Sequence, residues 1–146
     1  MTSPADDLVA LLDDAAPRLL TLDDARTTAP LRPGGWSRRQ LLGHLVDSAV
    51  VNVARVVRAA LEDGLVLPGY DQDAWVRVQG YDAVPWADLL AWWLAANRHL
   101  VHVLRRVPAA AWAHRVTVGS DPTTTLDGVA TSYVAHLRHH LAQLLA

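Results

Sequence analysis

The chain has 146 residues, of which 51% are hydrophobic and 19% are charged. This length predicts a single domain over residues 1–146 rather than a two-domain enzyme, and the composition excludes a disordered chain. Thirteen arginines, without any lysine, are balanced by fifteen acidic residues, and the net charge of −2 argues against a nucleic-acid partner. Cysteine is absent, so a metal site would have to use nitrogen and oxygen donors.

The amino-terminal residues and the distribution of charge suggest where the protein is found. Met1 to Asp7 contain no basic side chain and no apolar core, so this segment does not resemble a secretory signal. No stretch of ~18 residues is free of charge, which argues against a membrane span. We therefore expect a cytoplasmic protein that has no membrane partner.

Helical periodicity dominates the chain and predicts four long helices. The first covers about Pro4–Leu20, and a kink is expected at Pro17 because proline cannot donate a backbone hydrogen bond. The second begins at Ser37 and runs to about Asp63. Its start has the spacing of a capping box, with Gln40 three residues after Ser37, and a glycine that commonly follows a helix comes directly after its end.

A long connection, residues 65–84, separates the second helix from the third. It contains a short helix near Asp73–Gln79 and is longer than a tight turn between bundle helices needs. An insertion of this kind often covers a site. The third long helix follows Pro85, whose backbone angle suits the first helical position, and it stops before Pro108.

The last helix follows an irregular segment in which residues 114–119 favour a short strand. Thr124 and Asp127 resemble a helix cap, and the helix that they open continues to about Leu145. Four long helices joined by long connections predict an all-α fold, a four-helix bundle.

The last helix places two of its histidines beside the core. At about 100° per residue, His136 and His140 lie on one edge of the buried face, whereas His139 faces solvent. Residues at i and i+4 have Cβ atoms about 5–6 Å apart, so His136 and His140 can reach one cation. The i, i+3 pair His136–His139 is the rival geometry. The predicted core-facing stripe of this helix is made of Leu126, Ala130, Tyr133, Leu137, Leu141 and Leu144.

The second helix contributes a third histidine. His44 lies on a polar edge that leans inward beside a broad apolar arc, together with Asp47 and Arg55. Three neutral imidazoles from two facing helices are typical of catalytic zinc sites, in which a remaining position takes water or substrate. The alternative is that each is an ordinary hydrogen-bonded or solvated histidine. His99 and His102 fall on the far side of their helix and are expected at the surface.

Three further polar residues are candidates at this site. Asp47 is one turn from His44 and could orient its ring, act as a general base through water, or be a solvated charge. Arg55 could bind an anionic end of a substrate or pair with an acid. Gln143 shares the face of the two paired histidines and could hold one of them. Asp47 and Arg55 are therefore the catalytic candidates.

Two segments resemble the DinB/YfiT-like superfamily of metalloenzymes. The resemblance extends over nearly the whole chain and rests on the order, the separation and the helical placement of these segments. The resemblance implies a four-helix bundle in up-down-down-up order and a divalent metal ion, zinc or nickel, held by His44, His136 and His140. The segments are Trp36-Ser37-Arg-Arg-Gln-Leu-Leu-Gly-His44-Leu-Val-Asp47-Ser48, followed by Asn52 and Arg55, and Tyr133-Val-Ala-His136-Leu-Arg-His139-His140-Leu-Ala-Gln143.

The same resemblance implies a small-molecule substrate. The superfamily includes transferases that join low-molecular-weight thiols to electrophiles, a thiol-dependent maleylpyruvate isomerase and many members without an assigned reaction. We expect a metal-dependent thiol S-transferase. A metal-dependent hydrolase and a non-catalytic binding module are the alternatives. The expected assembly is a homodimer. An open coordination position facing a pocket lined by the connection around residues 70–81 would favour an enzyme, and a site closed by a fourth protein ligand would favour the module.

Overall fold

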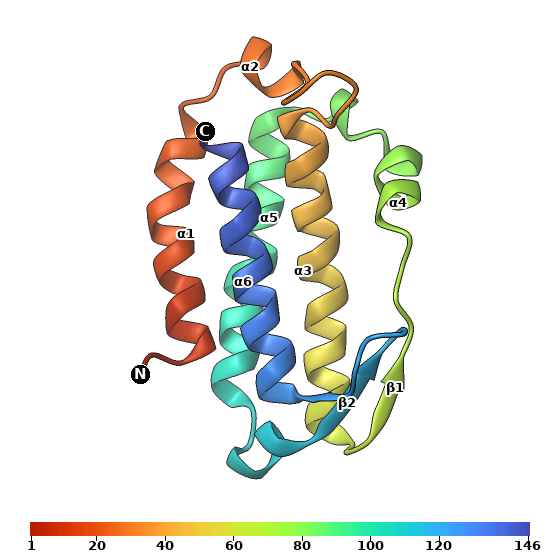
Figure 1. Ribbon diagram of the computed structural model, residues 1–146. Coiled ribbons are helices and arrows are strands. Elements are labelled where there is room, and N and C mark those ends of the chain that lie inside the picture. Colours follow the sequence, from red (N-terminus) through yellow and green to blue (C-terminus); the bar gives the residue numbers. More distant parts are fainter.

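The computed structural model describes all 146 residues, and four long helices lie side by side along its length (Figure 1). Each helix packs against two neighbours in the ring α1, α5, α3, α6. α1 and α6 run in one direction, and α3 and α5 run in the other. The predicted four-helix bundle with up-down-down-up order is therefore confirmed. The helices are α1 (Pro4–Leu20), α3 (Arg38–Leu61), α5 (Trp86–Arg106) and α6 (Leu126–Leu144).

Shorter elements lie in the connections between the long helices. The short helices are α2 (Asp24–Thr28), α4 (Gln72–Gln79), η1 (Tyr81–Ala83) and η2 (Ala109–Ala113), and the strands are β1 (Leu65–Leu67), β2 (Arg115–Val118) and β3 (Thr124–Thr125). β1 pairs parallel with β2, with Leu65 opposite Val116, and β2 pairs antiparallel with β3. β2 and α4 match the predicted short strand and short helix.

α3 and α5 are neighbours that run in the same direction, so the chain must return along the bundle between them. Residues 62–85 make this crossover along the outer side of α3 (Figure 1). β1 lies at the end of the crossover that follows α3, and α4 and η1 lie at the end that precedes α5. The length of the predicted connection thus follows from the direction of the two helices that it joins.

Side-chain caps start α3 and α6 at or close to the predicted positions. The Ser37 hydroxyl accepts the backbone N–H of Gln40, and the Gln40 side chain accepts the backbone N–H of Ser37, which completes the capping box. α3 ends at Leu61, about one half-turn before the predicted end. The cap of α6 is Thr125 rather than the predicted Thr124: α6 begins at Leu126, and the Thr125 hydroxyl accepts the backbone N–H of Gly128.

One apolar core of 31 buried residues fills the centre of the ring. All six residues of the predicted α6 stripe are buried. α1 continues through Pro17 without a break, because Pro17 lies on the exposed face, where water can satisfy the carbonyl group that loses its partner. Not every apolar residue of α3 is buried: Val57 is 40% exposed, so the buried face of α3 is narrower than its apolar pattern suggests.

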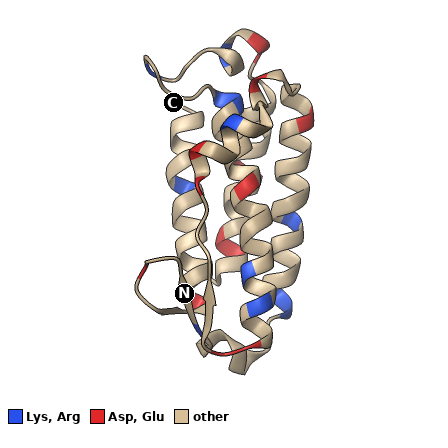
Figure 2. Cartoon of the chain, turned by 90° about the vertical axis from the view of Figure 1, so that its right-hand side faces the viewer, with Lys and Arg blue, Asp and Glu red and all other residues tan.

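Charged residues of both signs occur along the side of the molecule that carries the crossover, as Figure 2 shows. Arg39 is a buried charged residue that joins α3 to the preceding connection: it donates to the carboxylate of Asp24, which is exposed, and to the hydroxyl of Thr27. This contact fastens α2 over the end of the bundle where α3 begins. No helix combines the length and the apolar character that crossing a membrane requires.

Candidate metal centre

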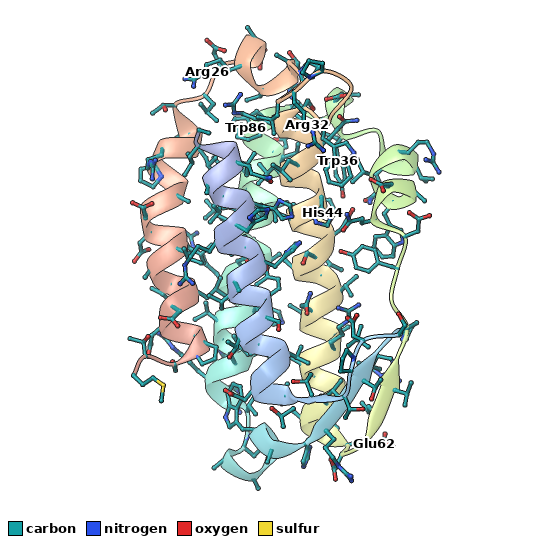
Figure 3. The ribbon with its side chains drawn as sticks, in the orientation of Figure 1. Arg26, Arg32, Trp36, His44, Glu62 and Trp86 are labelled. Carbon is teal, nitrogen blue, oxygen red and sulfur yellow. The ribbon has the colours of Figure 1, made fainter.

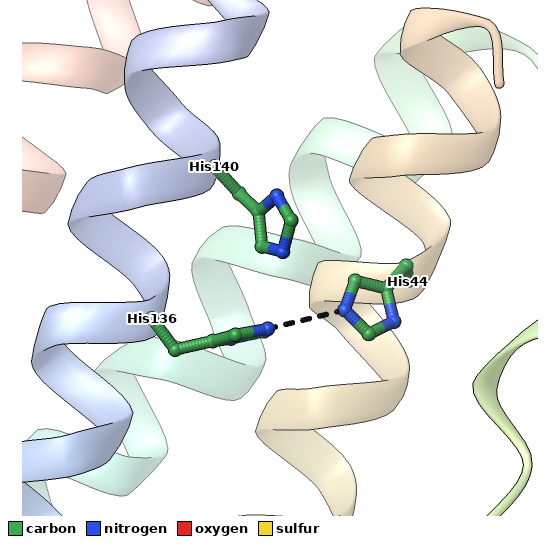
Figure 4. A group of neighbouring side chains, drawn as sticks. All are labelled: His44, His136 and His140. Carbon is green, nitrogen blue, oxygen red and sulfur yellow. Dashed lines mark hydrogen bonds between the residues drawn. The ribbon is translucent and has the colours of Figure 1, made fainter. Parts of the chain in front are cut away.

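Three histidine side chains from two helices point toward one another, as Figure 4 shows. His44 comes from α3, and His136 and His140 come from α6. One ring nitrogen from each lies within 4.8 Å of the other two, and the Nε2 atoms of His44 and His136 are 3.3 Å apart. Two nitrogen ligands at ~2.0–2.1 Å from a tetrahedral zinc ion are about 3.3 Å apart, so this separation fits a shared cation.

The helices hold the three rings at the end of the bundle nearer to Trp36 and Trp86 than to Glu62 (Figure 3). His44 is 1% exposed and lies with its ring centre 5.3 Å from that of Trp36. His136 and His140 are one turn apart on the partly buried edge of α6, as the helical period predicts. His44 is therefore more deeply buried than its expected place on the polar edge of its helix indicated.

Gln143 orients one of the three rings. The Nδ1 atom of His140 is 2.7 Å from the amide oxygen of Gln143, which can only accept a hydrogen bond. Nδ1 of neutral His140 therefore carries the proton, and Nε2 keeps its lone pair. A partner of this kind fixes the tautomer of a histidine that ligates a metal. The position expected for Gln143 is thus the one the structure shows.

Burial keeps the three imidazoles neutral. It lowers the pKa of His44 to about 4, with a further contribution from the nearby His136 and His140. It likewise lowers the pKa of His136 to about 4, and it lowers the pKa of His140. Neutral imidazole is the form that binds a metal ion. His44 Nδ1 is buried without a hydrogen-bond partner, so this ring is held in place by packing and by its neighbouring histidines.

The donor set fits a divalent cation with an open coordination position. The three histidines form a group without a fourth histidine, aspartate or glutamate within reach. A pocket of about 400 Å³ is lined by His44 and His136 and also by Tyr70 and Gln72 of the crossover. Ligand sites in proteins have volumes of about 300–1,000 Å³, so a small molecule can be accommodated. The crossover therefore covers part of a pocket that leads to the histidines, as expected from its length.

Asp47 does not line this pocket, and its surroundings rule out one of the three alternatives expected for it, a solvated charge. It is 3% exposed, and its Oδ1 atom accepts hydrogen bonds from the Tyr81 hydroxyl at 2.6 Å and the Gln79 amide at 2.8 Å. Burial raises the pKa of Asp47, while these two hydrogen bonds act in the opposite direction. Its Oδ2 atom has no partner. Asp47 thus joins α3 to the part of the crossover that contains α4 and η1, and no hydrogen bond links it to His44.

Tyr81 was not identified from the sequence, although one signal pointed to it. Gly43 lies inside α3, where glycine is about 1 kcal/mol less favourable than alanine. A Cβ atom at position 43 would lie 2.1 Å from the ring of Tyr81, which is 2% exposed. The close approach of this ring to α3 therefore requires glycine. An isolated glycine in a helical pattern often has such a packing reason.

Arg55 lies in the pocket. Of its two expected roles, pairing with an acidic side chain is not seen in the structure. Arg55 is partly buried, lines the same pocket as His44 and His136, and forms no salt bridge. Its nearest hydrogen-bond acceptor is the carbonyl oxygen of Pro68 at 3.5 Å. The one acidic residue that lines the pocket, Asp121, lies in the segment between β2 and β3, and no motif in the sequence marked it.

The remaining histidines lie outside the cluster. His139, His99 and His102 are exposed, as predicted. His114, which the sequence left uninterpreted, is held by the carbonyl oxygen of Ala59, 2.7 Å from its Nδ1 atom. The structure therefore brings together the three histidines that the helical wheels selected, and the rival pair His136–His139 does not converge with a third ligand.

Comparisons with known proteins agree with this fold. Residues 7–144 match the DinB superfamily. A protein of Bacillus pumilus named "Putative metal-dependent hydrolase" is 31% identical over 124 residues, which are 84% of this chain and 70% of that protein. A protein of Oceanobacillus iheyensis with the same description, OB0782, is 24% identical over 139 residues, 95% of this chain and 78% of that protein.

Two solved structures have the same fold. YfiT from Bacillus subtilis, which has an unusual four-helix bundle topology, superposes with a TM-score of 0.81 at 23% identity and covers 96% of this chain and 83% of its own. A mycothiol-dependent maleylpyruvate isomerase superposes with a TM-score of 0.80 at 16% identity and covers all of this chain, which spans 64% of the isomerase. The match over residues 7–144 and the arrangement of the helices show that the chain belongs to the DinB superfamily.

Proposed function

We propose that this protein is a metal-dependent enzyme that acts on a small molecule, and that His44, His136 and His140 are its metal ligands. One observation carries this proposal: three neutral imidazoles from facing helices converge beside a pocket, and no fourth protein ligand closes the group. A structural metal site would normally be closed by four protein ligands. The description of the Bacillus and Oceanobacillus relatives as metal-dependent proteins supports the same conclusion.

Zinc and nickel are the proposed metals, because imidazole nitrogen suits both ions and the chain has no cysteine. When bound, the ion supplies Lewis acidity, which lowers the pKa of a thiol or, in a hydrolase, of water. The chain itself would hold the three rings neutral, and Gln143 would keep Nε2 of His140 free to bind. The walls of the pocket, which include Tyr70 and Tyr133, would limit the access of water.

The reaction that we favour is transfer of a low-molecular-weight thiol to an electrophile. A free thiol with a pKa of ~8.5 contains little thiolate at neutral pH, so lowering that pKa is a useful task for the ion. The thiol must come from a cosubstrate, since the chain contains no cysteine. The fold similarity to an isomerase that depends on mycothiol supports a thiol cosubstrate, and the description of the curated relatives favours a hydrolase as the second candidate.

The two catalytic candidates are assigned different tasks. We propose that Asp47 keeps the crossover against α3, since its hydrogen bonds go to Gln79 and Tyr81 rather than to the pocket. Arg55 faces the pocket and is considered below. The single domain, the homodimer and the cytoplasmic location stay predictions.

Metal removal tests the proposed function. The protein stripped of metal should show no conjugation when glutathione, bacillithiol or mycothiol is offered with a generic electrophile, and zinc or nickel should restore it. The variant His44→Ala should behave like the stripped protein, and His139→Ala is the matched control that keeps activity. Conjugation that persists without metal would exclude this mechanism. Hydrolysis of ester or amide substrates that depends on metal, without thiol consumption, would favour the hydrolase.

A further inference from the structure

Arg55 is a positively charged side chain inside the pocket that has no partner of opposite charge. Its guanidinium group makes one long hydrogen bond, 3.5 Å to the carbonyl oxygen of Pro68, and its Cζ atom lies 6.0 Å from the centre of the Tyr70 ring. No carboxylate lies within 4.0 Å of it, as a salt bridge would require. Partial burial without a hydrogen-bonded anion is unfavourable for a guanidinium group. An anion bound beside Arg55 would therefore be stabilised by this charge.

The position of Arg55 along α3 sets the length of a molecule that could meet both ends of the pocket. Arg55 lies about three turns, or about 16 Å along the helix axis, from His44. Side chains on a helix lean toward its amino-terminal end, which for Arg55 is the direction of His44. The long side chain of Arg55 therefore brings its guanidinium group closer to the histidines than the axial separation of the two helix positions. The pocket is lined at one end by imidazoles and at the other by a cation.

Asp121 limits the charge of the anion that this end of the pocket would accept. It lines the same pocket and is close enough to attract Arg55 electrostatically, although the two groups are not in contact. A neighbouring carboxylate would repel an incoming dianion more strongly than a monoanion. The planar guanidinium also matches both oxygens of a carboxylate. A carboxylate is therefore favoured over a phosphate.

We infer that Arg55 binds a terminal carboxylate of the substrate, at the end of the pocket opposite to the atom that reacts beside the three histidines. This inference rests on the proposed function, since the histidines define the reacting end. Arg55 would then determine specificity by favouring elongated, singly charged acids over neutral molecules of the same shape. Asp121 would tune the same subsite by weakening the attraction for more highly charged anions.

A matched pair of thiols tests the inference by binding rather than by turnover. Zinc-loaded protein is titrated calorimetrically with 6-mercaptohexanoic acid and with 6-mercaptohexanamide, which differ only in the charged end. The wild-type protein should bind the acid at least about tenfold more tightly, because a hydrogen bond to a charged group contributes ~1.5–3 kcal/mol. The shorter pair, 3-mercaptopropionic acid and its amide, cannot span the pocket and should show a smaller preference.

Three variants identify the residue that is responsible. Arg55→Gln should remove the preference for the acid while it binds the amide as the wild type does, and Arg55→Lys should keep part of the preference. Asp121→Asn is the matched control. Because it removes a carboxylate that competes for Arg55, it should leave the preference for the acid over the amide unchanged or increase it. Loss of the preference in Asp121→Asn would show that Arg55 works only as a partner of Asp121 and would overturn the inference.

The remaining outcomes separate this inference from the proposed function. If both thiols bind equally to the wild-type protein, or if Arg55→Gln keeps the preference, the carboxylate subsite is excluded while the metal-dependent function stands. If 6-mercaptohexyl phosphate binds more tightly than the acid, the assignment to a carboxylate is wrong. If no thiol binds to the zinc-loaded protein, the proposed thiol-dependent function fails, and the inference fails with it.

Discussion

The two halves of the bundle bury different kinds of side chain. α1 buries only apolar residues, and α5 buries one polar residue, Asn97, which accepts a hydrogen bond from Tyr133 of α6 at 2.6 Å. α3 buries five polar or charged residues, and two of the three buried side-chain atoms without a partner belong to it, Nδ1 of His44 and Oδ2 of Asp47. The third is Nε1 of Trp93 in α5.

This difference shows where stability and function reside in the fold. A buried polar group without a hydrogen bond costs ~1–3 kcal/mol, so the α3–α6 side carries groups that weaken the folded state. The apolar side formed by α1 and α5 offsets that cost through the core that it shares with α3 and α6. Orphaned polar atoms at a site are often groups that await a ligand. The following predictions test whether metal binding depends on the α3–α6 side and stability on the α1–α5 side, each independently of the other.

The largest effect is expected on the α3–α6 side. His136→Ala and His140→Ala should each lower the affinity for zinc by at least about a hundredfold, because each removes a direct ligand and even a supporting residue is worth 10–100-fold. His139→Ala should keep the metal, since His139 is exposed. Metal analysis of the purified variants, followed by chelator competition, measures this. Metal retained by His140→Ala and lost by His139→Ala would replace the proposed ligands by the i, i+3 pair.

On the α1–α5 side the prediction is reversed. Leu89 of α5 is fully buried, so Leu89→Ala should lower the free energy of unfolding by ~2–5 kcal/mol through the lost apolar contact and the cavity that remains. Zinc affinity of the folded variant should equal that of the wild type. Denaturant unfolding of the metal-free protein and zinc titration measure the two quantities separately. A parallel loss of zinc affinity would show that the two halves are coupled.

The pH dependence of the free energy of unfolding shows how far burial lowers the pKa of the histidines. Folding lowers the pKa of His44 and of His136 from 6.5 to about 4, so the unfolded chain binds more protons than the folded chain between these values. The contribution of these two histidines to the stability of the metal-free protein is therefore fully present above about pH 6.5 and is lost as the pH is lowered toward 4. The loss should be on the order of 2–3 kcal/mol for the fully buried His44. Urea unfolding at a series of pH values measures it.

A matched variant isolates the contribution of His44 to this pH dependence. His44→Gln keeps a polar side chain that does not titrate, so its stability should vary less between pH 6.5 and pH 4 than that of the wild type. Hydrogen bonds with Ser3 and with Arg115 lower the pKa of Asp6 and of Asp63, so these two carboxylates titrate below this window and do not obscure the result. Identical profiles for the variant and the wild type would contradict the assigned burial effect.

The smallest effect is expected at the start of α3. Ser37→Ala removes the side chain that caps the helix and should lower the free energy of unfolding by ~0.5–2 kcal/mol. Ser37 also donates to the carboxylate of Asp82 at the far end of the crossover, so the upper part of that range is expected. The zinc content should not change. A denaturation midpoint equal to that of the wild type would show that this cap contributes nothing to stability.

Local patterns were sufficient for most of the helical architecture. The bounds of α1, the capping box of Ser37 and Gln40, and the buried stripe of α6 all follow from the spacing of apolar residues and from backbone groups within one or two turns. The wheel for α6 likewise separates His136 and His140 from His139. These features depend on interactions between residues close in sequence, which the chain encodes directly.

Other features were decided by contacts between distant segments. The pairing of β1 with β2 joins residues 51 positions apart in two short strands that have little pattern of their own, and it was not predicted. A helical wheel gives the angle of a side chain on its own helix but not the rotation of that helix against its neighbours. The depth of His44, the hydrogen bond of Asp47 with Tyr81 and the lack of a salt bridge at Arg55 depend on how the helices and the crossover pack. Only the tertiary structure determines them.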